Sequence, residues 1–233
     1  MTRIARAPAR GRQTPLGGYY QRLVQHFGPQ GWWPARTRME VILGAILTQN
    51  TSWKNAARAI ENLRKAGLLC FEPLRRASEA ELEACVRPAG FYRQKAAAIR
   101  NFIAWLDCNY HGSLRALFAG PADRVRLEVI GLKGIGPETA DAILLYAGRK
   151  AFFVADAYTR RILSRHGWLP PDATYADAQA LLHRELPHDE QLFNEFHALI
   201  VEAGKRYCRR QAADCKPCPL REFLPLEPPA NAF

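Results

Sequence analysis

Apolar residues recur every three or four positions along most of this chain, which is the spacing of amphipathic α-helices. In residues 189–208 they form one stripe, made of Leu192, Phe193, Phe196, Leu199, Ile200 and Ala203. Thr37, Ser52 and a Ser78–Glu81 capping-box pattern stand where helices should begin. Only residues 151–154 resemble a strand, and they are short and isolated. The pattern predicts an all-α fold.

Two breaks interrupt the helical pattern. The polar turn at residues 148–150 separates two groups of helices, so we expect a domain boundary there. Residues 1–14 are rich in arginine and contain no acidic residue, which is typical of a disordered basic arm; the alternative is an organelle transit peptide.

The net charge indicates what class of partner this chain binds. The chain carries 33 Lys and Arg against 22 Asp and Glu, a net charge of +11, which suits a polyanion such as a nucleic acid or an anionic membrane surface. No apolar run is long enough to span a bilayer. Cys70, Cys85 and Cys108 are scattered through apolar segments, and we expect them to be small buried side chains of a reduced, cytoplasmic protein.

The stretch LKGIGPETAD at residues 132–141 has glycines at Gly134 and Gly136 followed by a proline suited to the first turn of a helix. This pattern predicts a helix-hairpin-helix. The N–H groups of Gly134, Ile135 and Gly136 would point outward at the start of the second helix and bind a DNA phosphate. The alternative is an ordinary glycine turn between packed helices.

The hairpin is followed by FFVADAYTRRIL, with Asp156 twenty positions after Gly136. This pair of motifs, together with LGAILTQNT and GFYRQKAAAI upstream, resembles the endonuclease III superfamily of DNA glycosylases over residues 30–220. The resemblance implies two helical domains with a cleft between them. One is a six-helix barrel over residues 36–149, and the other is built from residues 15–35 and 150–233.

Glu138 indicates which members of the superfamily this chain resembles. Bifunctional members of the superfamily have at this hairpin position the lysine that attacks the sugar and nicks the strand. A carboxylate cannot form that Schiff base, so the resemblance implies a monofunctional glycosylase. Thr139, in the same hairpin, is expected at the DNA.

The pocket residues resemble those of the bacterial 3-methyladenine DNA glycosylase III enzymes. The resemblance places Trp32, Trp33, Pro34, Trp53 and Glu138 around an extruded base. A purine alkylated at N3 or N7 is cationic, so indole rings favour it over the neutral base. The tryptophans could instead be core residues, since most tryptophans are largely buried.

Three further residues have two interpretations each. The resemblance makes Asp156 the catalytic carboxylate, whereas its local sequence favours an N-cap, and the two roles are compatible. Gln49 resembles the residue that fills the gap left by the flipped base, or else it bonds backbone in a turn. Lys205 lies where the family has an active-site lysine, which can be carbamylated, or it is simply solvated.

Cys208, Cys215 and Cys218 reproduce the first three ligand positions of the endonuclease III [4Fe-4S] loop, and Leu224 stands where the fourth cysteine is expected. Three readings remain: a cluster with another fourth ligand, a zinc site completed by a residue such as histidine, or a loop without metal.

The sequence thus predicts a monomeric, cytoplasmic, nucleoid-associated DNA glycosylase of base excision repair that removes alkylated purines from double-stranded DNA. The alternatives are a glycosylase for another damaged or mismatched base, with or without lyase activity, and a non-catalytic DNA-binding module.

Overall fold

The structure is a computed structural model that describes residues 15–225; the arm expected at residues 1–14 lies outside that range. The chain divides into two compact units. One is Gly31–Val154, and the other combines the described parts of Met1–Gln30 and Ala155–Phe233. Within residues 15–225 every regular element is a helix, so the all-α prediction is confirmed.

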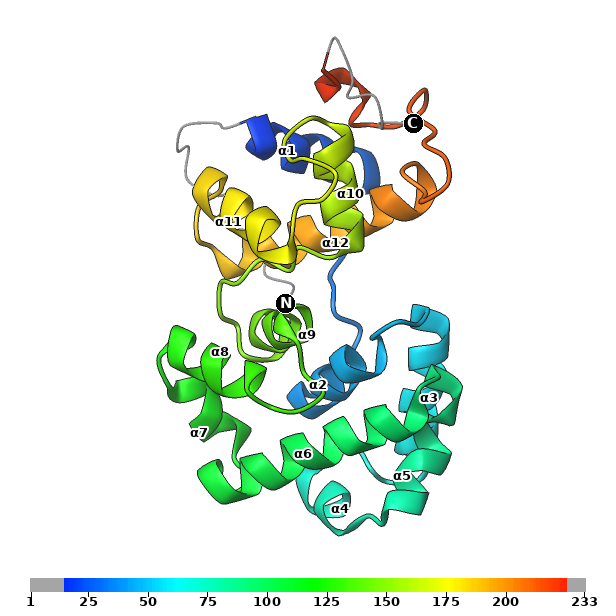
Figure 1. Cartoon of the computed structure of the whole chain (residues 1–233), viewed down its shortest axis with the longest axis vertical. Coiled ribbons are helices and arrows are strands. Elements are labelled where there is room, and N and C mark those ends of the chain that lie inside the picture. The colour runs from blue at the N-terminus through cyan, green and yellow to red at the C-terminus, as the bar shows by residue number, and fades with distance from the viewer. Residues whose placement is uncertain (1–14, 226–233) are drawn as a thin grey trace, which may run out of the picture. The chain divides into compact units, whose positions relative to one another are not determined.

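The unit Gly31–Val154 is built around one buried helix (Figure 1). Its elements are α2 (Arg38–Leu47), α3 (Trp53–Lys65), α4 (Phe71–Arg76), α5 (Glu79–Val86), η1 (Arg87–Ala89), α6 (Tyr92–Tyr110), α7 (Leu114–Ala119), α8 (Ala122–Ile130), α9 (Pro137–Ala142) and the π-helix η2 (Ile143–Ala147). Nine consecutive residues of α2, Met39 to Leu47, are buried, and α3, α6, α9 and η2 pack around it. A helix that is apolar all round belongs in a core.

Two buried charges of this unit are satisfied at the ends of α2. Glu40, in its first turn, accepts from the backbone N–H of Arg36 at 3.1 Å and pairs with Arg64. At the other end the Nζ of buried Lys95 donates to the carbonyls of Leu47 at 2.9 Å and Ala89 at 2.7 Å. Burial lowers the pKa of Lys95. Lys95 therefore ties α6 to α2 and η1.

The second unit consists of α1 (Pro15–Phe27), α10 (Ala157–Arg165), α11 (Tyr175–Glu185), α12 (Glu190–Arg206) and the short η3 (Arg221–Phe223). The apolar stripe expected along residues 189–208 is buried on α12, which packs against α1 and α10 (Figure 1). Tyr19 joins the parts of this unit, because its hydroxyl lies 2.8 Å from Nδ1 of His166 and accepts from Nε1 of Trp168 at 3.1 Å.

Local start signals performed as expected. Thr37 and Ser52 cap α2 and α3, and Ser78 with Glu81 forms a complete capping box on α5. The strand expected at residues 151–154 is wrong. This segment is an irregular connection, with no strand among residues 15–225 to pair with, although Phe153 and Val154 are buried.

The expectation for the scattered cysteines is also wrong. Cys70 and Cys108 are exposed and Cys85 is half-buried. Cys70 precedes the first turn of α4 and Cys108 lies in the last turns of α6, so both stand beside solvent rather than on the packed side of a helix.

Candidate active site and nucleic-acid interface

The turn between α8 and α9 has the geometry of a hairpin in which one glycine is obligatory. Gly134 has φ +95°, and a Cβ there would lie 2.7 Å from the Cβ of Ala98 on α6. Gly136 has φ −89° and nothing within 4 Å of the position of a Cβ. Gly134 therefore lets the turn close against α6, while Gly136 leaves open space in front of the backbone.

The structure corrects one detail of the predicted phosphate site. The N–H of Ile135 donates to the carbonyl of Leu132 at 3.0 Å, and the Ile135 side chain is buried. Ile135 thus closes the turn and does not present its N–H outward. Gly134 and Gly136 are exposed, so the predicted backbone contacts with phosphate rest on these two residues.

Gln49 connects the turn after α2 to the hairpin. Its Nε2 donates to the carbonyl of Gly134 at 3.0 Å and to Oγ1 of Thr139 at 2.9 Å. Thr139 is buried, so its hydroxyl serves this contact. The structure thus brings Gln49, Gly134 and Thr139 together, and the expected entry of Gln49 into the DNA stack remains a prediction.

A buried ion pair fixes α9 to α8. Asp141 is fully buried and receives Nε of Arg126 at 2.6 Å and Nη2 at 2.9 Å, a bidentate arrangement. The guanidinium also lies 5.3 Å from the centre of the Phe152 ring. This ion pair therefore holds together α8 and α9, the two helices that carry the hairpin.

Trp32, Trp33 and Trp53 lie together, as the sequence predicted. Their ring centroids form a triangle with every side 5.2 Å, and the planes are inclined by 54° to 85°. Each tryptophan is half-buried. The rings are thus neither wholly in the core nor wholly in solvent. Trp53 contacts Trp32 and Trp33 edge to face, and the Trp32–Trp33 pair is tilted.

Two residues that sequence reasoning missed hold Trp33 in this cluster. Tyr146, on the π-helix η2, lies 5.1 Å from the Trp33 ring. Gly44 on α2 makes room for it, since a Cβ there would come within 3.0 Å of Cζ2 of Trp33. A π-turn changes the direction in which a helix presents its side chains and is frequent at functional sites. The π-turn is visible only in the structure, so no signal in the sequence could have identified these two residues.

The spacing of the rings limits what fits between them. A flat ring between two parallel rings needs about 7 Å between them, twice a contact distance. The three indoles are closer than that, so no flat ring fits between any two of them as they stand. Pro34 and Glu138, also assigned to the pocket, are exposed, and Glu138 lies in the first turn of α9.

Asp156 is the N-cap of α10, as its local sequence indicated. Its Oδ1 accepts from the N–H of Thr159 at 2.8 Å and from Oγ1 of Thr159 at 3.0 Å. Oδ2 lies 3.6 Å from Nε2 of His197, a buried residue of α12. Burial acts to raise the pKa of Asp156, but His197 and Thr159 outweigh it and the pKa is lowered. The carboxylate is therefore ionised at neutral pH.

The family model described as HhH-GPD superfamily base excision DNA repair protein matches residues 43–188. The chain belongs to the HhH-GPD superfamily of DNA glycosylases. It is 44% identical over 206 residues to the protein named "Putative DNA repair glycosylase MJ1434" of Methanocaldococcus jannaschii, covering 88% of this chain and 93% of that one. The resemblance stated from the motifs is thereby confirmed.

Two solved structures show the same fold. The H. pylori 3-methyladenine DNA glycosylase bound to 1,N6-ethenoadenine matches with a TM-score of 0.71 at 28% identity, covering 81% of this chain and 94% of that one. A non-covalent endonuclease III–DNA complex matches with a TM-score of 0.77 at 21% identity, covering 90% and 93%. The second likeness establishes the HhH-GPD fold alone.

Lys205, expected at the HhH-GPD active site, is exposed near the end of α12. His197, which faces Asp156, lies about 12 Å further back along the same helix axis. The residue of α12 beside the carboxylate is therefore His197, and a catalytic role for Lys205 remains a prediction. His197 was missed because it lies within the apolar stripe of α12, where a histidine is indistinguishable from a packing residue.

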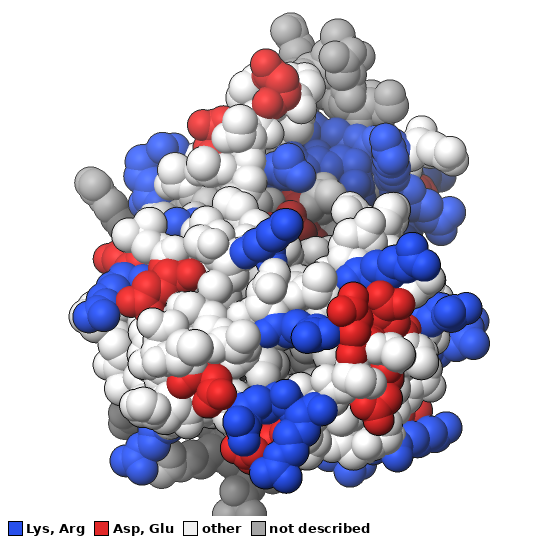
Figure 2. Space-filling model, turned by 60° about the horizontal axis from the view of Figure 1, so that its bottom comes forward, with Lys and Arg blue, Asp and Glu red and all other residues white. Residues whose placement is uncertain are grey.

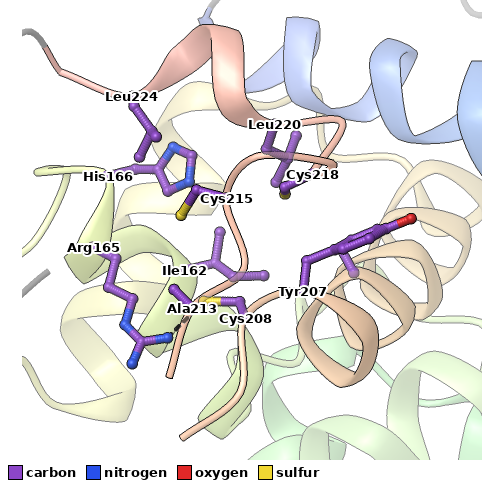
Figure 3. A pocket seen from close by; sticks show the side chains of 11 residues that line it. Ile162, Arg165, His166, Tyr207, Cys208, Ala213, Cys215, Cys218, Leu220 and Leu224 are labelled. Carbon is purple, nitrogen blue, oxygen red and sulfur yellow. Dashed lines mark hydrogen bonds between the residues drawn. The ribbon is translucent and has the colours of Figure 1, made fainter. Parts of the chain in front are cut away.

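The three clustered cysteines of this HhH-GPD chain line one small pocket with Leu224 and His166 (Figure 3). Its volume is ≈ 20 Å³, room for about one water. Burial raises the pKa of Cys215, and it raises the pKa of Cys218 to about 11. Within residues 15–225 no three His, Cys, Asp or Glu side chains are placed to hold a metal ion.

The donor set as it stands therefore does not fit a [4Fe-4S] cluster or a zinc ion. Leu224 occupies the fourth position with an apolar side chain, and Nη1 of Arg165 lies 3.1 Å from Sγ of Cys208. Nδ1 of His166, the histidine that lines this pocket, is engaged by Tyr19. The metal remains a prediction of the cysteine spacing.

The face drawn in Figure 2 carries both signs of charge. Lys and Arg side chains form scattered patches on it, with Asp and Glu beside several of them and uncharged residues between. In the turn before α6, the side chain of Phe91 is 64% exposed and the backbone has φ +46°. Arg87 and Arg93 lie over the ring of the adjacent Tyr92. None of the helices in the described range is long and apolar enough to cross a membrane.

Proposed function

We propose that this HhH-GPD protein is a monofunctional DNA glycosylase that removes alkylated purines of the 3-methyladenine type from double-stranded DNA. The observation that carries the proposal is the cluster of Trp32, Trp33 and Trp53. An alkylated purine is cationic, and an indole face favours a cation by about 0.5–2 kcal/mol. The likeness to a protein named as a 3-methyladenine DNA glycosylase supports alkylated purines as the substrate.

Asp156 supplies the charge that the reaction needs. As the glycosidic bond breaks, positive charge develops on the sugar, and a buried carboxylate stabilises it and orients the attacking water. Thr159 and His197 hold the carboxylate and keep its pKa low, so it stays ionised without an external base. The cationic base is a good leaving group, and little acid assistance is required.

The residue at the hairpin position supports the absence of lyase activity. Glu138 occupies the position of the nucleophilic lysine of bifunctional enzymes. Lys95 is buried with its Nζ donating to two carbonyls, and Lys133 is exposed before the hairpin glycines. We expect the enzyme to act as a monomer and to leave an intact strand with an abasic site.

The test uses purified protein and an alkylated duplex, with released bases and strand breaks measured separately before and after hot alkali. Free 3-methyladenine with breaks only after alkali supports the proposal. Breaks without alkali that borohydride traps would show a Schiff base and refute the monofunctional assignment. Release only from a duplex with a deaminated or mismatched base would move the substrate to another lesion, and release from none would favour a DNA-binding module.

A further inference from the structure

Helix α10, which begins directly after Asp156, carries three arginines and no acidic residue. Arg160, Arg161 and Arg165 line one pocket of ≈ 290 Å³ together with the side chain of Ser164. The pocket is also lined by Pro170, Pro171 and Ala173, from the connection between α10 and α11. Three positive charges on about two turns of one helix repel one another unless an anion lies between them.

Two of these arginines are held in place by neutral groups. Nε of Arg161 donates to the carbonyl of Cys208 at 2.7 Å, and its guanidinium lies 4.9 Å from the centre of the Tyr158 ring. Nη1 of Arg165 donates to the carbonyl of Arg209 at 2.8 Å. Carbonyls and rings orient the guanidinium groups but leave their charges uncompensated. No carboxylate in residues 15–225 pairs with any of the three arginines.

Arg160 differs from its neighbours. Its Nε is shielded from water and has no hydrogen-bond acceptor among the residues described. A shielded donor without an acceptor is destabilising, and native structures rarely keep one. An anion in the pocket that Arg160 lines would neutralise part of this local charge and offer the guanidinium an acceptor. A guanidinium offers two parallel donors, which match the oxygens of a phosphate.

We infer that this pocket binds a backbone phosphate of DNA, with Arg160 as the principal contact and Ser164 as a second donor. The inference rests on the proposed function in one respect, that the substrate is double-stranded DNA. It adds a phosphate site on the helix that begins at the candidate catalytic carboxylate. Inorganic phosphate shares the chemistry and is the alternative occupant.

The experiment measures binding of an undamaged duplex across a series of salt concentrations. Arg160→Gln should weaken binding about tenfold at low salt. It should also reduce the slope of log K against log salt by about one, the loss of a single phosphate contact. Arg160→Lys keeps the charge but lacks the forked guanidinium donors. The affinity of this variant for DNA should therefore lie between those of wild type and Arg160→Gln. The matched control is Arg184→Gln, because Arg184 is an exposed arginine of α11 that pairs with Glu185 outside the pocket.

Equal effects of Arg160→Gln and Arg184→Gln would overturn the site. If Arg160→Gln does not fold, the Arg160→Lys and Ser164→Ala variants take its place. A thermal stabilisation by inorganic phosphate that Arg160→Gln abolishes, with DNA binding unchanged, would assign the pocket to free phosphate and also overturn the inference. Since the duplex is undamaged, the result is independent of base release. An enzyme that releases no alkylated base but shows the Arg160 effect would refute the proposed function alone.

Discussion

Replacing Asp156 by asparagine separates the two roles of this side chain. Asparagine caps a helix about as well as aspartate does, so the acceptor for the N–H of Thr159 remains. The negative charge beside His197 is lost. Base release should therefore fall by at least about 100-fold, the usual contribution of one positioned acid or base. Affinity for undamaged duplex should stay within about twofold.

A second variant measures how much Asp156 contributes to the unfolding free energy as a helix cap. Asp156→Ala removes the cap, which costs about 1 kcal/mol of unfolding free energy. For a chain of this size that lowers the Tm by about 2–4 °C. The asparagine variant should melt closer to wild type than the alanine variant does, while both are inactive. Thermal melting and base release, measured on the same preparations, make the comparison.

The pH dependence of stability follows from the lowered pKa of Asp156. Because the folded pKa lies below the ordinary value of 3.8, ionisation of Asp156 favours the folded state above pH 3.8. This contribution is lost as the pH falls through the lowered folded value. The stability difference between wild type and Asp156→Asn in urea should accordingly narrow below pH 3.8. A difference that widens on acidification would contradict the assigned direction.

The rate of base release by Asp156→Asn decides whether Asp156 is catalytic. If Asp156→Asn released alkylated bases at the wild-type rate, the side chain would be a helix cap and nothing more, and another group would have to stabilise the sugar. Loss of DNA binding in the same variant would instead mean that Asp156 organises the interface rather than the reaction.

Four other substitutions test the framework around the site. Gly134→Ala should cost about 1–3 kcal/mol of unfolding free energy in urea, whereas Gly136→Ala, with open space around it, should cost less; equal effects would refute the obligatory glycine. Arg126→Met should cost about 3–5 kcal/mol by leaving Asp141 buried without its guanidinium, and a loss under 1 kcal/mol would contradict that pairing. Gly44→Ala should cost about 1–3 kcal/mol by displacing Trp33, and an unchanged tryptophan emission spectrum would count against the contact.

The sequence predicted the features that depend only on residues close together in the chain. Thr37 and Ser52 cap their helices through contacts within one turn, and Gly134 takes a conformation that other residues disfavour, so each is visible locally. The contacts of Gln49 and His197 join distant segments, and only the folded chain reveals them. The Ile135 N–H was misassigned because a glycine-rich turn does not show which of its amides are consumed within the turn.

The aromatic cluster suggests why a cationic base is selected in the proposed reaction. Without a base, Trp32, Trp33 and Trp53 already contact one another, and each aromatic pair is worth about 0.5–1.5 kcal/mol. A neutral base that displaces a ring exchanges one aromatic contact for another of similar strength and gains little. An alkylated base makes the same exchange and adds a cation–π contribution of about 0.5–2 kcal/mol, or roughly 2- to 30-fold in binding. Contact among the rings would then cancel most of the affinity for normal bases and leave the charge as the basis of discrimination.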